Sequence, residues 1–122
     1  MGRVLLVDDE PAVLFTLREV LADRGHEPIT AASGREALTR LEGAEAVVTD
    51  LAMPGMSGLE LLPIMRDMDG CEDLPAIFLS GRVEHADVEA GRALNATYLT
   101  KPFSAIALCK AVERLSPVEA GW

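Results

Sequence analysis

Short apolar runs alternate along the chain with longer segments in which apolar positions repeat every three or four residues. The runs predict five strands, at residues 4–7, 27–31, 46–50, 76–80 and 97–99. The longer segments predict five helices, at residues 11–24, 34–41, 58–68, 83–93 and 103–115. This alternation is typical of βα units around a mainly parallel sheet. We therefore expect an α/β fold in which helices flank a doubly wound, five-stranded parallel sheet.

Residues at the predicted helix ends support these ranges. Pro11 fits the first turn of the first helix, where its missing N–H is harmless, and Gly25 ends that helix. Ser33 is followed three residues later by Glu36, which is the pattern of a capping box. Ser57 is the expected N-cap of the third helix.

Composition and charge exclude several classes of protein. The 122 residues are the length of one domain, and 49% of them are hydrophobic, which is enough for a buried core. The 20 acidic residues against 11 basic ones give a formal net charge of −9, which repels the phosphates of nucleic acids and of anionic membranes. No apolar run is long enough to span a bilayer. We expect one domain, residues 1–122, located in the cytoplasm, that binds neither nucleic acid directly nor a membrane.

The cysteines and histidines do not predict a disulfide framework or a metal site. Cys71 and Cys109 are far apart in sequence and have no CxxC partner, so we expect both to be free thiols. His26 and His85 have no second histidine or cysteine at ligand spacing, and we expect structural roles for them.

The residues at the ends of the predicted strands carry the candidate chemistry. Asp8 and Asp9 follow the first strand, Asp50 ends the third, Ser80 ends the fourth and Lys101 follows the fifth. In an open parallel sheet the carboxyl ends of the strands form the edge where ligands bind. Three ionised carboxylates at one edge repel each other, so a hard divalent cation with oxygen ligands, such as Mg²⁺, would compensate them.

An ordinary structural role is the alternative for the aspartates. Aspartate is common where a strand leads into a helix, because its side chain caps backbone N–H groups. Asp8 and Asp9 could cap the first helix in this way, and Asp50 could cap a turn. Capping does not explain Lys101, which follows a strand and whose ammonium group can reach back to the same edge. The combination favours a functional site.

These positions belong to motifs that occur in a fixed order. The motifs are the acidic pair Asp8-Asp9, the stretch 50–54 with Gly58 eight residues after its aspartate, the pair Ser80-Gly81, and the stretch 98–103. In this order and spacing they resemble the receiver domain of two-component response regulators, over residues 3–115. The resemblance implies a flavodoxin-like receiver fold with strand order 2-1-3-4-5, followed by an exit segment at residues 116–122.

The resemblance also implies a chemical function. Asp50 would accept a phosphoryl group from a phosphohistidine on a sensor histidine kinase or a histidine phosphotransfer protein. Asp8, Asp9, Asp50 and the backbone carbonyl of Ala52 would hold Mg²⁺, for which Mn²⁺ could substitute, and Lys101 would pair with the phosphoryl group. An ionised carboxylate needs no external base to react in this way. The protein would be a signalling phosphoprotein able to lose its own phosphoryl group, and not an enzyme that turns over an external substrate.

A switch and its tuning follow from the same resemblance. The Ser80 hydroxyl would move toward the phosphoryl group and Tyr98 would turn inward, which would change a surface read by a downstream protein target. The structural alternative for Tyr98 is a partly buried strand aromatic. Ala52 and Arg82, each two residues after a site residue, would tune how long the phosphoryl group lasts, although Arg82 could simply be solvated.

Two side chains of the first predicted helix are candidates for partner docking. Leu14 and Phe15 lie beside the core stripe of this helix and close to the acidic edge. Receiver domains receive their phosphohistidine partner on this helix, so the resemblance implies a docking role for both. The alternative is that they are isolated apolar side chains, which are ordinary on a protein surface.

Other functions fit the sequence less well. A phosphatase of the haloacid-dehalogenase type also uses an aspartate and Mg²⁺ on such a sheet, but its second aspartate would stand where this chain has Glu10. A flavodoxin-like nucleotide binder needs a Gly/Ser/Thr-rich loop after the first strand, where this chain is acidic. A degenerate receiver that binds proteins without phosphorylation is the remaining alternative, although Asp50 and Lys101 are both present.

Overall fold

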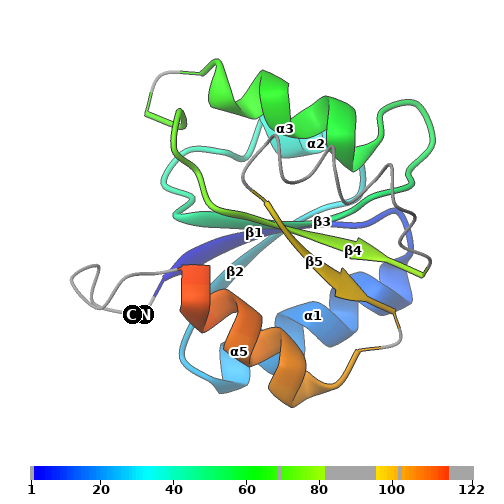
Figure 1. Ribbon diagram of the computed structural model, residues 1–122, viewed down its shortest axis with the longest axis vertical. Coiled ribbons are helices and arrows are strands. Elements are labelled where there is room, and N and C mark those ends of the chain that lie inside the picture. Colours follow the sequence, from blue (N-terminus) through cyan, green and yellow to red (C-terminus); the bar gives the residue numbers. More distant parts are fainter. Residues whose placement is uncertain (1, 69, 82–95, 102, 116–122) are drawn as a thin grey trace.

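Five parallel strands form one sheet in the computed structural model, which describes residues 2–68, 70–81, 96–101 and 103–115 (Figure 1). The spatial order of the strands is β2-β1-β3-β4-β5. Their bounds are β1 (Arg3–Val7), β2 (Glu27–Ala31), β3 (Ala46–Asp50), β4 (Ala76–Ser80) and β5 (Thr97–Thr100). The predicted fold class and strand order are confirmed, and each predicted strand range agrees to within one residue at either end.

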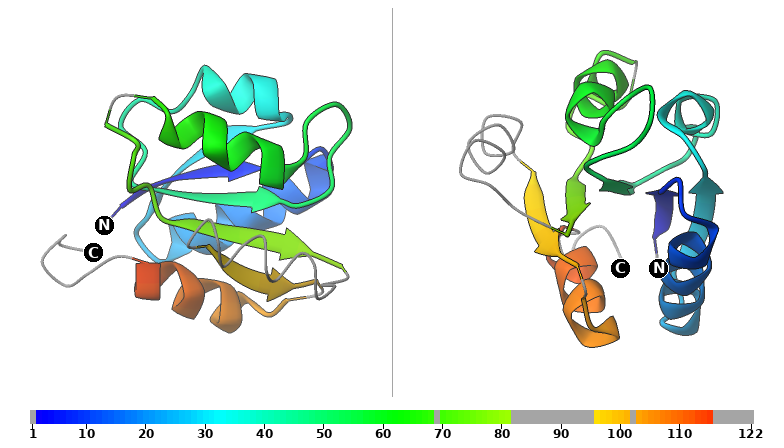
Figure 2. Two further views of the ribbon diagram at one scale, coloured as in Figure 1. Left: turned by 45° about the horizontal axis from the view of Figure 1, so that its top comes forward. Right: turned by 90° about the vertical axis from the view of Figure 1, so that its right-hand side faces the viewer.

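Helices cover both faces of this sheet. α1 (Pro11–Asp23) and α5 (Ala105–Leu115) lie on one face, whereas α2 (Gly34–Leu38) and α3 (Gly58–Arg66) lie on the other (Figures 1 and 2). These four helices occupy the predicted positions, but α2 and α3 end before residues 41 and 68, and α5 begins after residue 103. The helix predicted at residues 83–93 lies outside the described part of the chain.

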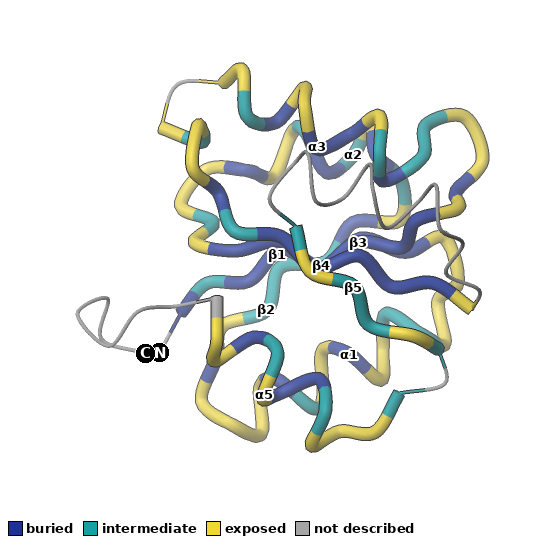
Figure 3. The backbone as a smooth tube through the Cα atoms, viewed as in Figure 1, coloured by how far each residue is buried: buried dark blue, intermediate teal, exposed yellow. Residues whose placement is uncertain are grey.

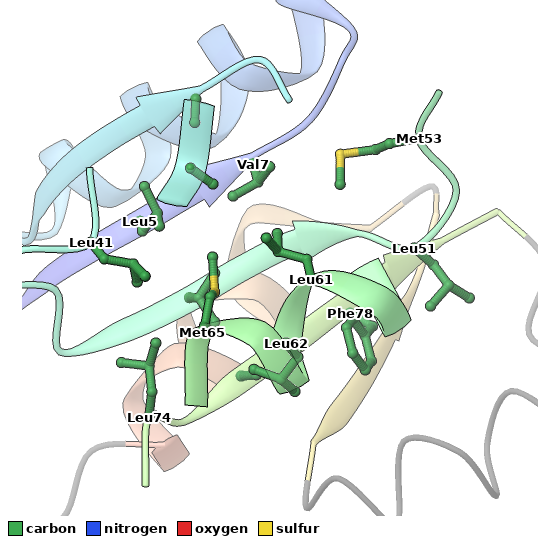
Figure 4. Close-up of a cluster of buried hydrophobic side chains, with 14 residues drawn as sticks. Leu5, Val7, Leu41, Leu51, Met53, Leu61, Leu62, Met65, Leu74 and Phe78 are labelled. Carbon is green, nitrogen blue, oxygen red and sulfur yellow. The ribbon is translucent and has the colours of Figure 1, made fainter. Parts of the chain in front are cut away.

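Alternate residues of the strands point to opposite faces of the sheet, and they contribute to two hydrophobic clusters, one on each face. The cluster under α2 and α3 includes odd positions of β1 and β3 and even positions of β4, and Figure 4 shows Leu61, Leu62 and Met65 of α3 extending toward the sheet. The cluster under α1 and α5 includes even positions of β1 and β3 and odd positions of β4, with Leu17, Leu21, Leu108 and Val112 from the helices. β3 and β4 are therefore buried on both faces, as Figure 3 shows, which is typical of central strands in a parallel sheet.

The serine caps predicted for α2 and α3 both form, but only one capping box is complete. Ser57 Oγ accepts the Glu60 N–H (3.2 Å), and Glu60 Oε1 accepts the Ser57 N–H (3.1 Å). Ser33 Oγ likewise accepts the Glu36 N–H (3.1 Å), whereas Glu36 Oε1 accepts the N–H of Ala32 (3.2 Å) instead of that of Ser33. The predicted capping box at α2 is therefore only half right.

We expect Ser57→Ala to lower the free energy of unfolding by about 1 kcal/mol, because it removes the side-chain acceptor of the Glu60 N–H and leaves that N–H only the Ser57 backbone carbonyl (3.2 Å). Urea unfolding followed by circular dichroism measures this loss. Ser57→Thr is the matched control, since it keeps the capping oxygen and should unfold close to the native midpoint. An equal loss in both variants would show that the cap hydrogen bond is not the cause.

The cysteines, the histidines and the helix lengths can also be compared with what the sequence predicts. Cys71 and Cys109 are both free thiols, as predicted. His26 is buried at the start of β2, and burial lowers the pKa of its imidazole, so the neutral form is favoured in the fold; His85 lies outside the described residues. Within the described ranges, no helix has both the length and the apolar character that crossing a membrane requires.

Candidate functional site

The strand ends at the carboxyl edge of the sheet bring five predicted side chains to one region. Asp8 and Asp9 follow β1, Asp50 is the last residue of β3, Ser80 is the last residue of β4, and Lys101 follows β5. The parallel register keeps β3, β4 and β5 level at this edge. The Lys101 N–H also donates to the Ser80 carbonyl (2.7 Å), which ties the two strand ends together.

Three carboxylates form a cluster at this edge. One oxygen from each of Asp8, Asp9 and Asp50 lies within 4.8 Å of the other two. Asp8 is fully buried and Asp50 is only 7% exposed, whereas Asp9 is open to solvent. A set of carboxylate oxygens with one open side matches the coordination preferences of a hard divalent cation that keeps some of its water.

Lys101 supplies the positive charge beside this cluster. Its Nζ lies 3.2 Å from Asp8 Oδ2 and 3.4 Å from Asp50 Oδ1, so one ammonium group bridges two carboxylates. Burial by itself lowers the pKa of Lys101, but the hydrogen bond to Asp8 and the negative charges of Asp8 and Asp50 outweigh it and raise that pKa above its usual value. Lys101 is therefore charged at neutral pH.

One ammonium group does not compensate three carboxylates. Burial raises the pKa of Asp50, and the neighbouring charges of Asp8 and Asp9 raise it further, while Lys101 acts in the opposite direction. The net result is a raised pKa, which means that ionising the Asp50 carboxyl in the fold requires more free energy than ionising it in water. A divalent cation would balance the net of two negative charges that the three carboxylates and one ammonium leave.

The carboxylate of Asp8 contacts both the start of α1 and Lys101, so a local structural role does not account for all of its contacts. The N-cap of α1 is Glu10, and no side chain makes a cap hydrogen bond at that helix. Asp8 Oδ1 accepts the Glu10 N–H (2.9 Å), Asp8 Oδ2 contacts Lys101, and the Asp8 N–H donates to the carbonyl of Ala31 (3.2 Å). Asp8 is thus fixed by β2, by the start of α1 and by Lys101, with its carboxylate facing the cluster.

Besides Ser80, the residues predicted for the switch and for tuning are Tyr98, Ala52 and Arg82. Tyr98 is half-buried in β5, where its ring lies 5.4 Å from that of Phe78 (between centroids) at an interplanar angle of 50°. Ala52 is exposed in the loop after β3, two residues beyond Asp50. Arg82 lies outside the described residues.

The two predicted docking residues of α1 differ in exposure. Phe15 is 56% exposed, and the guanidinium carbon of Arg18 lies 5.5 Å from the centre of its ring. Leu14 is half-buried and packs against the cluster under α1 and α5. Phe15 is therefore the more exposed of the two, whereas Leu14 packs partly against the core and also lines a surface hollow with Phe15.

Thr49 contacts the backbone of Asp50 and was not singled out by the sequence pattern. It is 1% exposed, and its Oγ1 donates to the backbone carbonyl of Asp50 (3.0 Å). The available signal was a hydroxyl side chain in an otherwise apolar strand, directly before the candidate acceptor. Threonine is common in strands, so this signal is weak without the hydrogen bond.

Comparisons with known proteins identify the class of this domain. The family model of the response regulator receiver domain matches residues 4–113. The transcriptional regulatory protein KdpE of Mycobacterium tuberculosis is 41% identical over 106 residues, which are 84% of this chain and 46% of KdpE. The chain thus spans about half the length of this relative. The chain belongs to the response regulator receiver domain family.

Solved structures agree with this assignment. Chemotaxis protein CheY4 of Vibrio cholerae superposes with a TM-score of 0.91 at 32% identity, covering 95% of this chain and 99% of the other. Response regulator TrrA of Thermotoga maritima, solved in complex with Mg²⁺–BeF, gives a TM-score of 0.82 at 33% identity over 95% of this chain and all (100%) of TrrA. Receiver domains are signalling domains of two-component systems and do not turn over an external substrate.

Proposed function

We propose that this receiver domain accepts a phosphoryl group on Asp50 from a phosphohistidine of a sensor histidine kinase or a histidine phosphotransfer protein. The bridging position of Lys101 Nζ, between Asp8 and Asp50, is the observation that carries the proposal. It fixes a positive charge beside the one carboxylate that ends a central strand. A cytoplasmic location belongs to the same proposal, in keeping with the two free thiols.

Mg²⁺ is the cation that fits the donor set. Asp8, Asp9 and Asp50, with the backbone carbonyl of Ala52, would hold it, and Mn²⁺ could take its place. The complex of TrrA with Mg²⁺–BeF supports this choice. When bound, such a cation draws together the charge on the phosphoryl oxygens. The uncompensated negative charge around Asp50 supports the same choice from the electrostatics of this chain.

The chemical step needs few protein groups. A carboxylate oxygen of Asp50 forms a bond to phosphorus, the phosphorus–nitrogen bond of the donor breaks, and the electron pair of that bond stays on the imidazole nitrogen. The product is an acyl phosphate on Asp50. Asp50 acts in its ionised form, so no general base is required. The ammonium group of Lys101 would leave its carboxylate contacts to pair with a phosphoryl oxygen.

The response to phosphorylation would run from Ser80 to Tyr98. Ser80 ends β4 at the same edge as Asp50, so its hydroxyl would donate to the phosphoryl group, and Tyr98 on the adjacent strand would turn inward. A downstream protein target would read the resulting surface. In this proposal Ala52 and Arg82 set the lifetime of the acyl phosphate, and Leu14 and Phe15 on α1 contact the phosphohistidine partner.

Phosphorylation by acetyl phosphate tests the proposal directly. The native chain and Asp50→Asn are incubated with acetyl phosphate, with and without Mg²⁺, and the intact mass is measured. We expect a single phosphoryl adduct on the native chain that requires Mg²⁺, and none on Asp50→Asn. The variant keeps the size of the side chain and removes only its nucleophilic charge, so it serves as the matched control.

Two outcomes would overturn the proposal. An adduct that persists in Asp50→Asn would place the acceptor elsewhere. The absence of any adduct on the native chain, together with a failure to bind beryllofluoride, would favour the alternative that this receiver domain binds proteins without phosphorylation. Circular dichroism of the same samples checks that both proteins are folded, so that a missing adduct is not caused by unfolding.

A further inference from the structure

Thr49 carries a hydroxyl group into one of the most apolar parts of the molecule. It is 1% exposed, and its register partners are Val7 in β1 and Phe78 in β4, both of which belong to the cluster under α2 and α3. A buried hydroxyl costs free energy unless it makes a hydrogen bond. This one does so, because Thr49 Oγ1 donates to the carbonyl of Asp50 (3.0 Å).

The acceptor of that bond belongs to the peptide group that joins Asp50 to Leu51. The N–H of the same peptide group, on Leu51, donates to the carbonyl of Leu79 in β4 (2.8 Å). The register with β1 ends at the pair of Val7 with Thr49, so Asp50 lies one residue beyond that ladder. The Thr49 hydroxyl therefore holds the carbonyl end of a peptide group whose N–H end is held by β4.

Gly58 completes the surroundings of this carbonyl. A Cβ atom at position 58 would lie 2.6 Å from the Asp50 carbonyl oxygen, so the first residue of α3 approaches it as closely as a glycine allows. The Gly58 N–H donates to the next carbonyl, that of Leu51 (2.8 Å). Two successive peptide groups after the candidate phosphoacceptor are thus fixed by hydrogen bonds and by close packing.

We propose that Thr49 is a positioning residue for phosphoryl transfer. Its hydroxyl fixes the peptide group between Asp50 and Leu51, and this keeps the Asp50 carboxylate beside Lys101 despite repulsion from the Asp8 carboxylate. The inference rests on the proposed role of Asp50 as phosphoacceptor. Thr49 touches no reacting atom, so it acts only through the backbone of Asp50. Misplacing a reacting group by a fraction of an ångström lowers the rate of a transfer step substantially.

Three variants test this role through the rate of phosphorylation by acetyl phosphate in Mg²⁺. Thr49→Val keeps the shape of the side chain and removes the hydroxyl, and we expect its rate to fall about tenfold. Thr49→Ser keeps the hydroxyl, and its rate should return to within about threefold of the native rate, which a purely structural role for the methyl group would not produce. Thr39→Val removes a comparable hydroxyl-to-carbonyl bond, from Thr39 to Glu36 (2.7 Å), on the exposed end of α2 and should leave the rate unchanged.

The possible results separate this inference from the proposed function. If the native chain forms no adduct, the proposed function fails. If the native chain reacts and Thr49→Val reacts equally fast, only the positioning role is overturned. It is also overturned if Thr49→Ser falls as far as Thr49→Val. All rates are measured well below the urea and thermal midpoints of each variant, so that differences in stability do not enter them.

Discussion

Gly58→Ala is expected to lower the free energy of unfolding by about 2 kcal/mol, even though alanine is the better helix former. The added Cβ would lie 2.6 Å from the carbonyl oxygen of Asp50 and 3.2 Å from two ring carbons of Phe78. The first contact is with backbone, which cannot move aside as a flexible side chain can. Either the start of α3 or the end of β3 must shift, and both lie in the buried core.

Urea unfolding measures this loss, and a second glycine provides the control. Gly81 is exposed after β4, and a Cβ there would meet no atom within 4 Å. Gly81→Ala should therefore unfold within about 0.5 kcal/mol of the native chain. If Gly58→Ala were as stable as Gly81→Ala, the close approach of α3 to the Asp50 carbonyl would not be a constraint on the fold.

Replacing Lys101 with glutamine is expected to lower the free energy of unfolding by about 2 kcal/mol in magnesium-free buffer. The substitution removes the ammonium group that bridges Asp8 and Asp50, and it leaves two buried carboxylates facing each other. The loss should shrink when Mg²⁺ is added, because a bound cation would compensate the same carboxylates. Magnesium should therefore stabilise Lys101→Gln more than it stabilises the native chain.

Urea titrations in EDTA and in Mg²⁺, on the same protein samples, measure both parts of this prediction. Lys110→Gln is the matched control, because Lys110 is exposed on α5 and its replacement should change the stability little in either buffer. A Lys101→Gln variant that loses equal stability with and without Mg²⁺ would contradict the idea that lysine and cation compensate one charge cluster.

The sequence predicts the sheet well because its three central strands are short, mostly apolar runs, whereas the two edge strands, β2 and β5, carry more polar residues. The helix ends are harder to predict, and α2 shows why. Leu41 continues the apolar pattern and is buried, yet the helix ends at Leu38, and the N–H groups of Thr39 and Arg40 donate to carbonyls three residues back. The apolar side chain at position 41 enters the core from a turn, which periodicity does not distinguish from a helix.

In the candidate site, too, some residues are predictable from the sequence and some contacts are not. Asp8, Asp50 and Lys101 are predictable from their places at strand ends, since a parallel sheet brings those ends together. The hydrogen bond of Thr49 is not predictable, because it depends on where the β1–β3 ladder ends relative to Asp50. The partial burial of Leu14 depends in the same way on the exact rotation of α1 over the sheet.

Phe78 has a place in the fold that constrains how this sequence can diverge. One side of its ring packs against Tyr98, and another lies where a side chain at position 58 would have to go. A smaller residue at position 78 would leave a cavity beside the ring of Tyr98, whereas position 58 would still be restricted to glycine by the carbonyl oxygen of Asp50. In an alignment of close relatives positions 78 and 98 should therefore vary together, whereas the glycine at position 58 should stay constant whichever residues occupy them.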